Sequence, residues 1–398
     1  MNMNSFNKGV IIIMFLIGSL CMTLASCGSG QAQGSGEALL QDCPLVHIAG
    51  TSGVNLEISI DDFNALGFAY GDSVDIAFSN GYALEDIPYY SGYYVEAYAP
   101  LLVAYPGADY VKATINYGDD LWTEAGLQED DTATVSIHEK EKYLEIQEAD
   151  DIQYSDDRED FPSDEVFANF RSVTAGDIRE NVLYRSASPC DNIHNRASYT
   201  DDLIEAAGVE YIVDLTDNDE LIESYISDED FDSPYFLKQY QESDVLPLYM
   251  SMNYLSEDFQ KTLADGLNAM AAEEGPYLVH CTEGKDRTGF VCMLLEALCG
   301  ADYQEIVDDY MLTYDNYYGI TEESDPDRYN TIKEQNLDVM LQSIVSDDAA
   351  DTDAAGSAEA RPDVAGLTGA ELSGYAKDYL LRIGLDEQTV EKLKERLE

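Results

Sequence analysis

A short apolar run, a polar loop and a long apolar segment follow one another between Tyr277 and Gly300, and no other stretch constrains the fold as strongly. "YLVH" (277–280) has the composition and length of a buried strand. "RTGFVCMLLEALCG" (287–300) predicts an almost wholly apolar helix that ends at Gly300. A buried strand joined to a buried helix is typical of an α/β sheet that carries helices on both faces.

The same alternation of strands and helices extends over residues 166–398, which we predict to form one α/β domain. Further strands are predicted at 211–215 and 245–250, and helices at 199–207, after the N-cap residue Ser256, and around 303–317, 329–345, 367–383 and 387–397. The low-complexity stretch at 346–363 is predicted to be an insertion between two of these helices.

Residues 44–147 follow a different pattern, rich in Gly and Tyr, and are predicted to form a β-rich module of unknown role. The predicted strands are "VDIAF" (74–78), "YYVEAY" (93–98), "YVKATINY" (110–117) and "ATVSI" (133–137). The stretches 67–78 and 126–137 resemble each other, which suggests an internal repeat in a small β-barrel. The tyrosines of this module serve either sheet packing or a binding surface. The acidic segment 148–165 is predicted to be an interdomain linker that leaves the module separable from the chemistry.

The first 26 residues are predicted to be a bacterial lipoprotein signal peptide. Lys8 precedes an apolar run that is short for a membrane span, and "LASCG" (24–28) resembles the lipobox, in which the cysteine becomes the acylated N-terminus. Cys27 is therefore the predicted lipidation site, and the Gly/Ser-rich segment 27–43 the predicted tether. We expect an extracytoplasmic lipoprotein of the bacterial cell envelope, anchored to a membrane through Cys27; an ordinary secreted protein and an uncleaved anchor are the alternatives.

The charge of the chain excludes one class of partner. Lys and Arg number 21 against 79 Asp and Glu, which gives a net charge of −58. Nucleic acid is not expected as a partner, because phosphate backbones bind basic surfaces. The cysteines beyond the tether are too scattered for a disulfide framework or a zinc site, so neither a metal nor a cofactor is expected.

Against this acidity, residues 280–287 gather a cysteine and two cations in one loop, which we name the cysteine loop. Backbone N–H groups that lead into a helix N-terminus form an anion cradle and favour the thiolate of a cysteine placed there. Arg287 can hold two oxygens of a phosphate, so Cys281 is the predicted nucleophile toward a phosphoryl group. The nucleotide-binding motif G-x-x-x-x-G-K-[ST] does not fit, because Asp286 follows Gly284-Lys285. A merely structural Cys281 would leave the neighbouring charges unexplained.

The segment His280–Gly289 resembles the signature of cysteine-dependent tyrosine phosphatases, in the bacterial branch whose loop reads HCxxGKDRTG and which includes tyrosine and phosphoinositide phosphatases. Other pieces occur in that family's order: "NFRSV" (169–173), "NVLYRSASP" (181–189), "YIVDLTDNDE" (211–220) and "DDYMLT" (308–313). The β-rich module has no part in the resemblance. Thr216 departs from it, because that branch commonly has arginine there, and this puts the substrate preference in doubt.

The resemblance and the chemistry of the residues assign the same roles. Cys281 attacks phosphorus, while Arg287 and the backbone N–H groups of residues 282–287 hold the phosphoryl oxygens. His280 orients the loop and helps to keep Cys281 ionised, and Thr288 donates its hydroxyl to the sulfur. Thr282, Glu283 and Gly284 belong to the predicted substrate-binding set through their backbone, and Lys285 adds a contact to substrate phosphate.

Two questions stay open at the level of the sequence. The resemblance suggests Asp286 as the general acid, but its cationic neighbours favour the ionised form, and Asp214 and Asp217 are the alternatives. The predicted activity is hydrolysis of phosphate monoesters, most of all in phosphotyrosine proteins. The alternatives are a phosphatase for inositol phosphates or phosphoinositides, favoured by Lys285, and a non-catalytic phosphate-binding module of the envelope.

Overall fold

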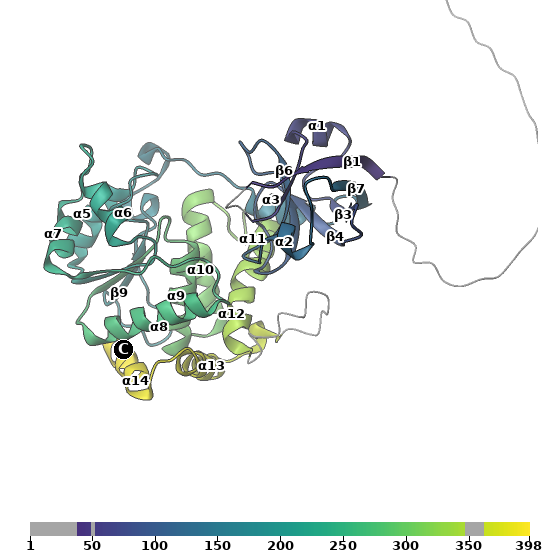
Figure 1. The fold of residues 1–398 in the computed structure, drawn as a ribbon. Coiled ribbons are helices and arrows are strands. Elements are labelled where there is room, and N and C mark those ends of the chain that lie inside the picture. The colour runs from purple at the N-terminus through teal and green to yellow at the C-terminus, as the bar shows by residue number, and fades with distance from the viewer. Residues whose placement is uncertain (1–37, 49–51, 347–361) are drawn as a thin grey trace, which may run out of the picture. The chain divides into compact units, whose positions relative to one another are not determined.

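The computed structural model describes residues 38–48, 52–346 and 362–398 (Figure 1). These residues form a β-barrel followed by an α/β domain, as predicted. The predicted signal peptide, Cys27, most of the tether and most of the insertion at 346–363 lie outside the described residues. In the described part of the chain, we find no helix with the length and apolar character needed to span a bilayer.

The first sheet closes into a barrel in the order β1-β2-β6-β5-β4-β3-β7. Its strands are β1 (Ala38–Val46), β2 (Val54–Leu56), β3 (Ser73–Phe78), β4 (Ala83–Tyr90), β5 (Pro100–Val103), β6 (Val111–Ile115) and β7 (Thr132–Glu139). All neighbouring strands are antiparallel except β4 and β5, which are parallel. β1 begins at Ala38, inside the range predicted to be a tether, because 38–46 pairs with both β7 and β2.

Alternation along the strands fills the barrel. Val74, Ile76 and Phe78 of β3 are buried in its core, whereas the residues between them are partly or fully exposed. Two short helices, α1 (Ile60–Ala65) and α2 (Leu121–Glu124), complete the module. A closed barrel leaves no sheet edge unpaired, which suits a small all-β unit.

One predicted strand is absent. "YYVEAY" (93–98) is irregular, and Tyr98 has a left-handed backbone with φ of 68°. The side chain of Asn116 donates hydrogen bonds to the carbonyls of Val95 and Glu96 and holds the loop in place. Alternating aromatic residues predict a strand from local pattern alone, but here tertiary hydrogen bonds hold another conformation.

The second sheet has the order β11-β10-β12-β9-β8. Its strands are β8 (Arg171–Ser172), β9 (Leu183–Ser186), β10 (Tyr211–Asp214), β11 (Val245–Pro247) and β12 (Tyr277–His280). The four strands from β9 to β12 are parallel, and β8 pairs antiparallel at one edge. β12 lies at the centre, so the loop that follows it emerges at the carboxyl edge of the sheet, where parallel α/β folds bind ligands.

Helices cover both faces of this sheet. Ile212 and Leu278 pack against α5, α6 and α7, whereas Val213 and Val279 point to the other face and join the core formed with α8, α9 and the C-terminal helices. The principal helices are α5 (Ala197–Ala207), α6 (Asp219–Ile226), α7 (Pro234–Glu242), α8 (Glu257–Ala272), α9 (Asp286–Leu298), α10 (Tyr303–Tyr318), α11 (Pro326–Ile332), α12 (Asp338–Val345), α13 (Gly369–Arg382) and α14 (Glu387–Leu397). Three short helical segments are η1 (Arg158–Asp160), η2 (Lys333–Leu337) and η3 (Val364–Gly366).

The segment predicted to be a linker at 148–165 has structure of its own. α3 (Leu144–Asp150) runs across the predicted boundary, and α4 (Asp164–Phe167) ends the segment. Glu145 accepts a hydrogen bond from Thr331 at 2.9 Å and Asp150 accepts one from Asn336 at 3.4 Å, so α3 is bound to the α/β domain. Within the predicted linker, Asp150 thus has a specific donor in the α/β domain, whereas residues 151–157 are irregular.

Candidate active site

The cysteine loop connects the end of β12 to the start of α9. Gly284 has φ of +68°, and a Cβ placed there would lie 2.2 Å from the carbonyl oxygen of Ser186, so only glycine fits. Cys281 lies at the bottom of the loop with 3% of its surface exposed. Within the described chain, no side chain caps the first turn of α9, which leaves N–H groups that an anion could satisfy.

Three side chains hold the loop from outside. Asn169 and Arg185 donate to the carbonyl of Gly284 at 3.2 and 2.9 Å, and Tyr317 donates to the carbonyl of Glu283 at 2.7 Å. In a trans peptide the C=O and the following N–H point in opposite directions. The N–H groups of Gly284 and Lys285 are therefore turned toward the inside of the loop.

The scaffold behind these contacts is an ion triad in which Arg185 is buried and the other two members are partly buried. Asp309 on α10 accepts from Arg171 Nε at 2.7 Å and from Arg185 Nη1 at 2.5 Å. Burial would raise the pKa of Asp309, but the two guanidinium groups outweigh it and hold the pKa below its ordinary value. Arg171, Arg185 and Asp309 all come from segments that carried the family resemblance, although the sequence did not show that they pair.

Two residues of α9 face the same loop. Arg287 Nη1 donates to the carbonyl of Met250 at 3.2 Å, which fixes the guanidinium with one of its five N–H groups. Thr288 is buried, and its hydroxyl has no hydrogen-bond partner among the described residues. The loop thus combines a buried thiol, an anchored guanidinium, inward N–H groups and an unpartnered hydroxyl, which together suit a tetrahedral oxyanion beside the sulfur.

Residues 166–398, more than half of the chain, match the model of the tyrosine phosphatase family. The chain belongs to this family. It is 35% identical over 133 residues to a tyrosine-protein phosphatase from Nostoc commune, a match that covers 32% of this chain and 40% of that relative. The chain therefore spans well under two thirds of the curated relative's length, and the barrel lies outside the family match.

In this tyrosine phosphatase family member, the three carboxylates considered as general acid have different environments. The Asp286 side chain is 50% exposed and lies 3.9 Å from Lys285 Nζ, at the mouth of the loop. Asp214 and Asp217 are both 0% exposed, behind the loop. A leaving oxygen in the loop can approach only Asp286 among these three without a rearrangement of the interior.

The interior group at the end of β10 consists of Asp214, Asp217 and His280, and burial shifts the pKa of each of them. Burial raises the pKa of Asp214 to about 6, and burial together with Asp214 raises that of Asp217 to about 7. Burial lowers the pKa of His280 to about 4, and its Nε2 lies 3.8 Å from Asp214 Oδ2. Cys190, Asp214 and Asp217 bring three ligand-type atoms within 4.8 Å of one another, yet this trio is enclosed and offers no position open to a substrate.

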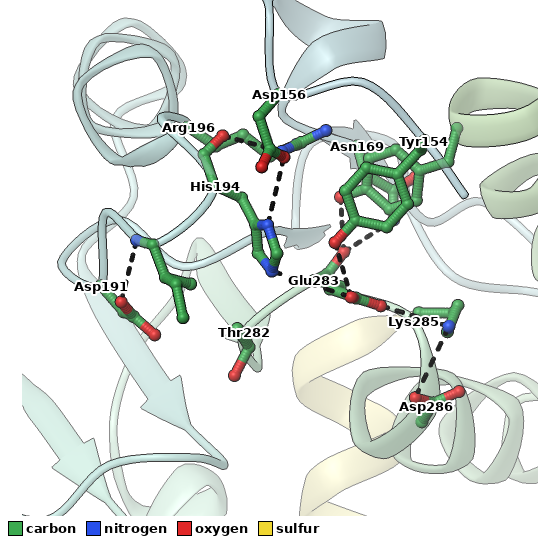
Figure 2. Close-up of polar contacts among 12 residues, drawn as sticks. Tyr154, Asp156, Asn169, Asp191, His194, Arg196, Thr282, Glu283, Lys285 and Asp286 are labelled. Atoms are coloured by element: carbon green, nitrogen blue, oxygen red, sulfur yellow. Dashed lines mark hydrogen bonds and ion pairs between the residues drawn. The ribbon is translucent and has the colours of Figure 1, made fainter. Parts of the chain in front are cut away.

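Lys285 is bound within the loop. Its Nζ lies 3.2 Å from Glu283 Oε2, and the opposite oxygen of Glu283 accepts from Tyr154 at 2.6 Å (Figure 2). His194 Nε2 approaches the same carboxylate at 3.9 Å. The predicted contact between Lys285 and a substrate phosphate therefore competes with the ion pair between Lys285 and Glu283. Sequence reasoning missed Tyr154 because it precedes the family signature by sequence and meets Glu283 only in the fold.

Thr216, which departs from the family pattern, contacts the cysteine loop. Its hydroxyl accepts the N–H of Thr282 at 3.1 Å. That N–H, which we expected to hold a phosphoryl oxygen, is engaged by a side chain here. The cradle expected at 282–287 therefore has its first donor committed, because a threonine hydroxyl reaches the loop from the turn after β10.

Proposed function

We propose that the protein hydrolyses phosphate monoesters, foremost phosphotyrosine in proteins, through a cysteinyl-phosphate intermediate. The observation that carries the proposal is Cys281, buried at the bottom of a loop whose carbonyls are tied outward, with Arg287 at the uncapped start of α9. Such a site stabilises both a thiolate and the anionic transition state of phosphoryl transfer.

The proposed reaction has two steps. Cys281 Sγ attacks phosphorus, the S–P bond forms as the bond to the leaving oxygen breaks, and Asp286 gives its proton to that oxygen. Water then attacks phosphorus, the S–P bond breaks, and Asp286 accepts the water proton while the Thr288 hydroxyl donates to the departing sulfur. Arg287 and the inward N–H groups hold the equatorial oxygens in both steps.

The charges around the loop favour a substrate with a single phosphate. Lys285 already pairs with Glu283 and lies near Asp286. A second phosphate would need a cation free of carboxylate partners, because an ion pair must otherwise be broken to bind it. Inositol phosphates and phosphoinositides therefore rank second. A non-catalytic phosphate-binding module ranks third, since both Cys281 and Arg287 are present.

The test combines two variants with substrates of different leaving groups. Cys281→Ser should abolish turnover of every phosphate ester. Asp286→Asn should lower kcat about 10²–10⁴-fold for a phosphotyrosine peptide, and much less for an aryl phosphate whose leaving group departs as an anion. Equal losses on both esters would remove Asp286 from the role of acid, and faster turnover of inositol phosphates than of peptides would favour the second substrate class.

The site of action is a separate proposal. The lipobox-like "LASCG" (24–28) supports a lipoprotein of the bacterial envelope, anchored through a lipid on Cys27. Cells fed a fatty-acid analogue should label the wild-type protein and leave Cys27→Ala unlabelled. Equal labelling of the two proteins would count against this anchor.

A further inference from the structure

The barrel touches the loop that anchors Arg287. The side chain of Asn253 donates to the hydroxyl of Tyr98 at 3.1 Å, and Asn253 is only 7% exposed. Three residues earlier, the carbonyl of Met250 accepts from Arg287. A residue of the barrel module is therefore bound to the same short loop, 249–255, that fixes the phosphate-binding guanidinium.

A second tyrosine of the barrel also meets the loop 249–255. The hydroxyl of Tyr117 is within electrostatic reach of Arg287 and Asp286 and faces the backbone of Met252. Its pKa is raised, chiefly by burial of the hydroxyl. The residue is nevertheless 49% exposed.

The two tyrosines belong to one end of the β5–β6 pair. Pro100 is opposite Ile115, and Tyr98 N–H donates to the carbonyl of Asn116 at 2.6 Å. Both Tyr98 and Tyr117 have positive φ, 68° and 53°, which costs roughly 1 kcal/mol or more per residue for a side chain of this kind. Both tyrosines therefore lie at the end of the β5–β6 pair that meets the loop 249–255.

We infer that the barrel module supplies one wall of the substrate-binding mouth, in which Tyr98 fixes the module to the loop 249–255 and Tyr117 contacts the peptide beyond the phosphotyrosine phosphate. This inference rests on the proposed phosphotyrosine activity and adds the source of its peptide selectivity. A half-exposed tyrosine offers a flat apolar face and a polar tip at little entropic cost, which suits contact with an aryl ring and its backbone.

This arrangement would give the barrel module a role in substrate binding. The sequence favoured a barrel that is separable from the chemistry, because the family signature begins after it. On the present inference the module belongs to the substrate-binding mouth instead, through the bond of Tyr98 to Asn253 and the approach of Tyr117 to Met252. A small aryl phosphate fills the cysteine loop but reaches little of this wall, whereas a peptide must lie along it, so the two substrates separate phosphate binding from wall contact.

The experiment uses the full chain with Tyr117→Ala, Tyr117→Phe and a matched control, Tyr105→Ala. Tyr105 is 59% exposed and lies at the other end of the β5–β6 pair. For Tyr117→Ala, kcat/KM for a phosphotyrosine peptide should fall about tenfold more than kcat/KM for p-nitrophenyl phosphate, a change of about 1.4 kcal/mol. Tyr117→Phe should retain most of the selectivity, and Tyr105→Ala should match the wild type on both substrates.

Binding in the Cys281→Ser background gives a second readout. The Kd for the same phosphopeptide should rise about tenfold when Tyr117→Ala is added, while the Kd for inorganic phosphate changes much less. Equal losses on peptide and small ester, or a peptide Kd insensitive to Tyr117→Ala, would overturn the inference. A wild-type protein that hydrolyses no phosphate ester, yet binds the peptide through Tyr117, would overturn the proposed activity and leave the wall standing.

Discussion

Two carboxylates at the end of β10, Asp214 and Asp217, are buried, and neither forms an ion pair with a Lys or Arg of the described residues. Asp214 Oδ1 accepts the N–H groups of Thr216 and Asp217, and Asp217 accepts from Tyr225 at 3.2 Å. Burial comes first among the causes that raise the pKa of Asp214 to about 6 and that of Asp217 to about 7. The folded protein therefore releases the protons of this pair at higher pH than the unfolded chain does.

The resulting prediction concerns stability against pH. Between about pH 4 and pH 7 the folded state binds more protons on Asp217 than the unfolded state does, so its contribution to the free energy of unfolding falls as pH rises. Asp217→Asn keeps the shape and removes this titration. Relative to the wild type, the variant should gain on the order of 1 kcal/mol or more between pH 5 and pH 8, because one pKa unit corresponds to about 1.4 kcal/mol.

Urea denaturation at pH 5 and pH 8 measures this difference, with the exposed Asp202→Asn on α5 as the control. The ionisable groups that face Asp217 are the same in both proteins, namely Cys190, Asp191, Asp214, Tyr225 and His280. The lowered pKa of His280 acts with the opposite sign, and this contribution largely cancels in the comparison. A stability difference that stays constant with pH would show that Asp217 is ionised throughout.

At the residue scale, the sequence predicted what lies in one contiguous stretch. Cys281 and Arg287 could be proposed as site residues because the chemistry proposed for them depends on a loop that begins a helix, which local composition reveals. Tyr317 and Asp309 could not, because their roles are hydrogen bonds to residues far away in sequence. The commitment of the Thr282 N–H to Thr216 was likewise beyond any local pattern.

Among the elements, the segment between α3 and α4 has an unexpected part in the site. Tyr154 stacks on Tyr317 with ring centroids 4.9 Å apart, and the guanidinium of Arg196 lies 4.7 Å from the centroid of the Tyr154 ring. Burial alone would raise the pKa of Glu283, but Lys285 and the Tyr154 hydroxyl outweigh it and keep the pKa below its ordinary value. The segment thus secures the charge of a carboxylate inside the cysteine loop.

We predict that Tyr154→Phe lowers kcat several-fold on a small aryl phosphate and lowers the free energy of unfolding by about 1–3 kcal/mol, as expected for a hydrogen bond to a charged group. The phenyl ring retains the stack on Tyr317, so the change isolates the bond to Glu283. Steady-state kinetics and urea denaturation measure the two effects.

The matched control is Tyr235→Phe on α7, which removes a bond of 2.6 Å to the carbonyl of Val209. This control should cost stability and leave kcat unchanged, because α7 lies against the other face of the sheet. If Tyr154→Phe also changed stability alone, the segment would be a structural support without influence on the loop.

Helices and strands whose apolar residues recur with a clear period were predicted close to their observed bounds. Segments whose conformation depends on tertiary contacts were not. β12 and α14 coincide with the predicted 277–280 and 387–397, since a buried strand and an amphipathic helix reveal themselves by composition. The loop 91–99 was predicted to contain a strand, but Asn116 holds it in an irregular conformation. Its distinguishing feature, the left-handed Tyr98, depends on contacts outside the stretch.

The whole molecule presents a contrast between a strongly negative surface and a small anion site. The net charge is −58, whereas the cysteine loop carries two cations, one of them already paired. The negative electrostatic potential of so many carboxylates opposes the approach of any anionic substrate. The local N–H groups act only at contact, so they determine binding once the substrate arrives but do not attract it from a distance.

This balance predicts how salt changes the rate with two phosphotyrosine peptides of equal length, one flanked by acidic and the other by basic residues. Raising the ionic strength from about 0.01 M to about 0.15 M shortens the Debye length from about 30 to about 8 Å and screens the field of the protein. For the acidic peptide, kcat/KM should rise several-fold, because repulsion weakens; for the basic peptide it should fall, because attraction weakens. kcat should change little for either, since the chemistry proposed for Cys281 and Arg287 takes place at contact distance. Parallel changes for both peptides would mean that salt acts on the site itself, and that the acidity of the molecule has no part in selecting its substrates.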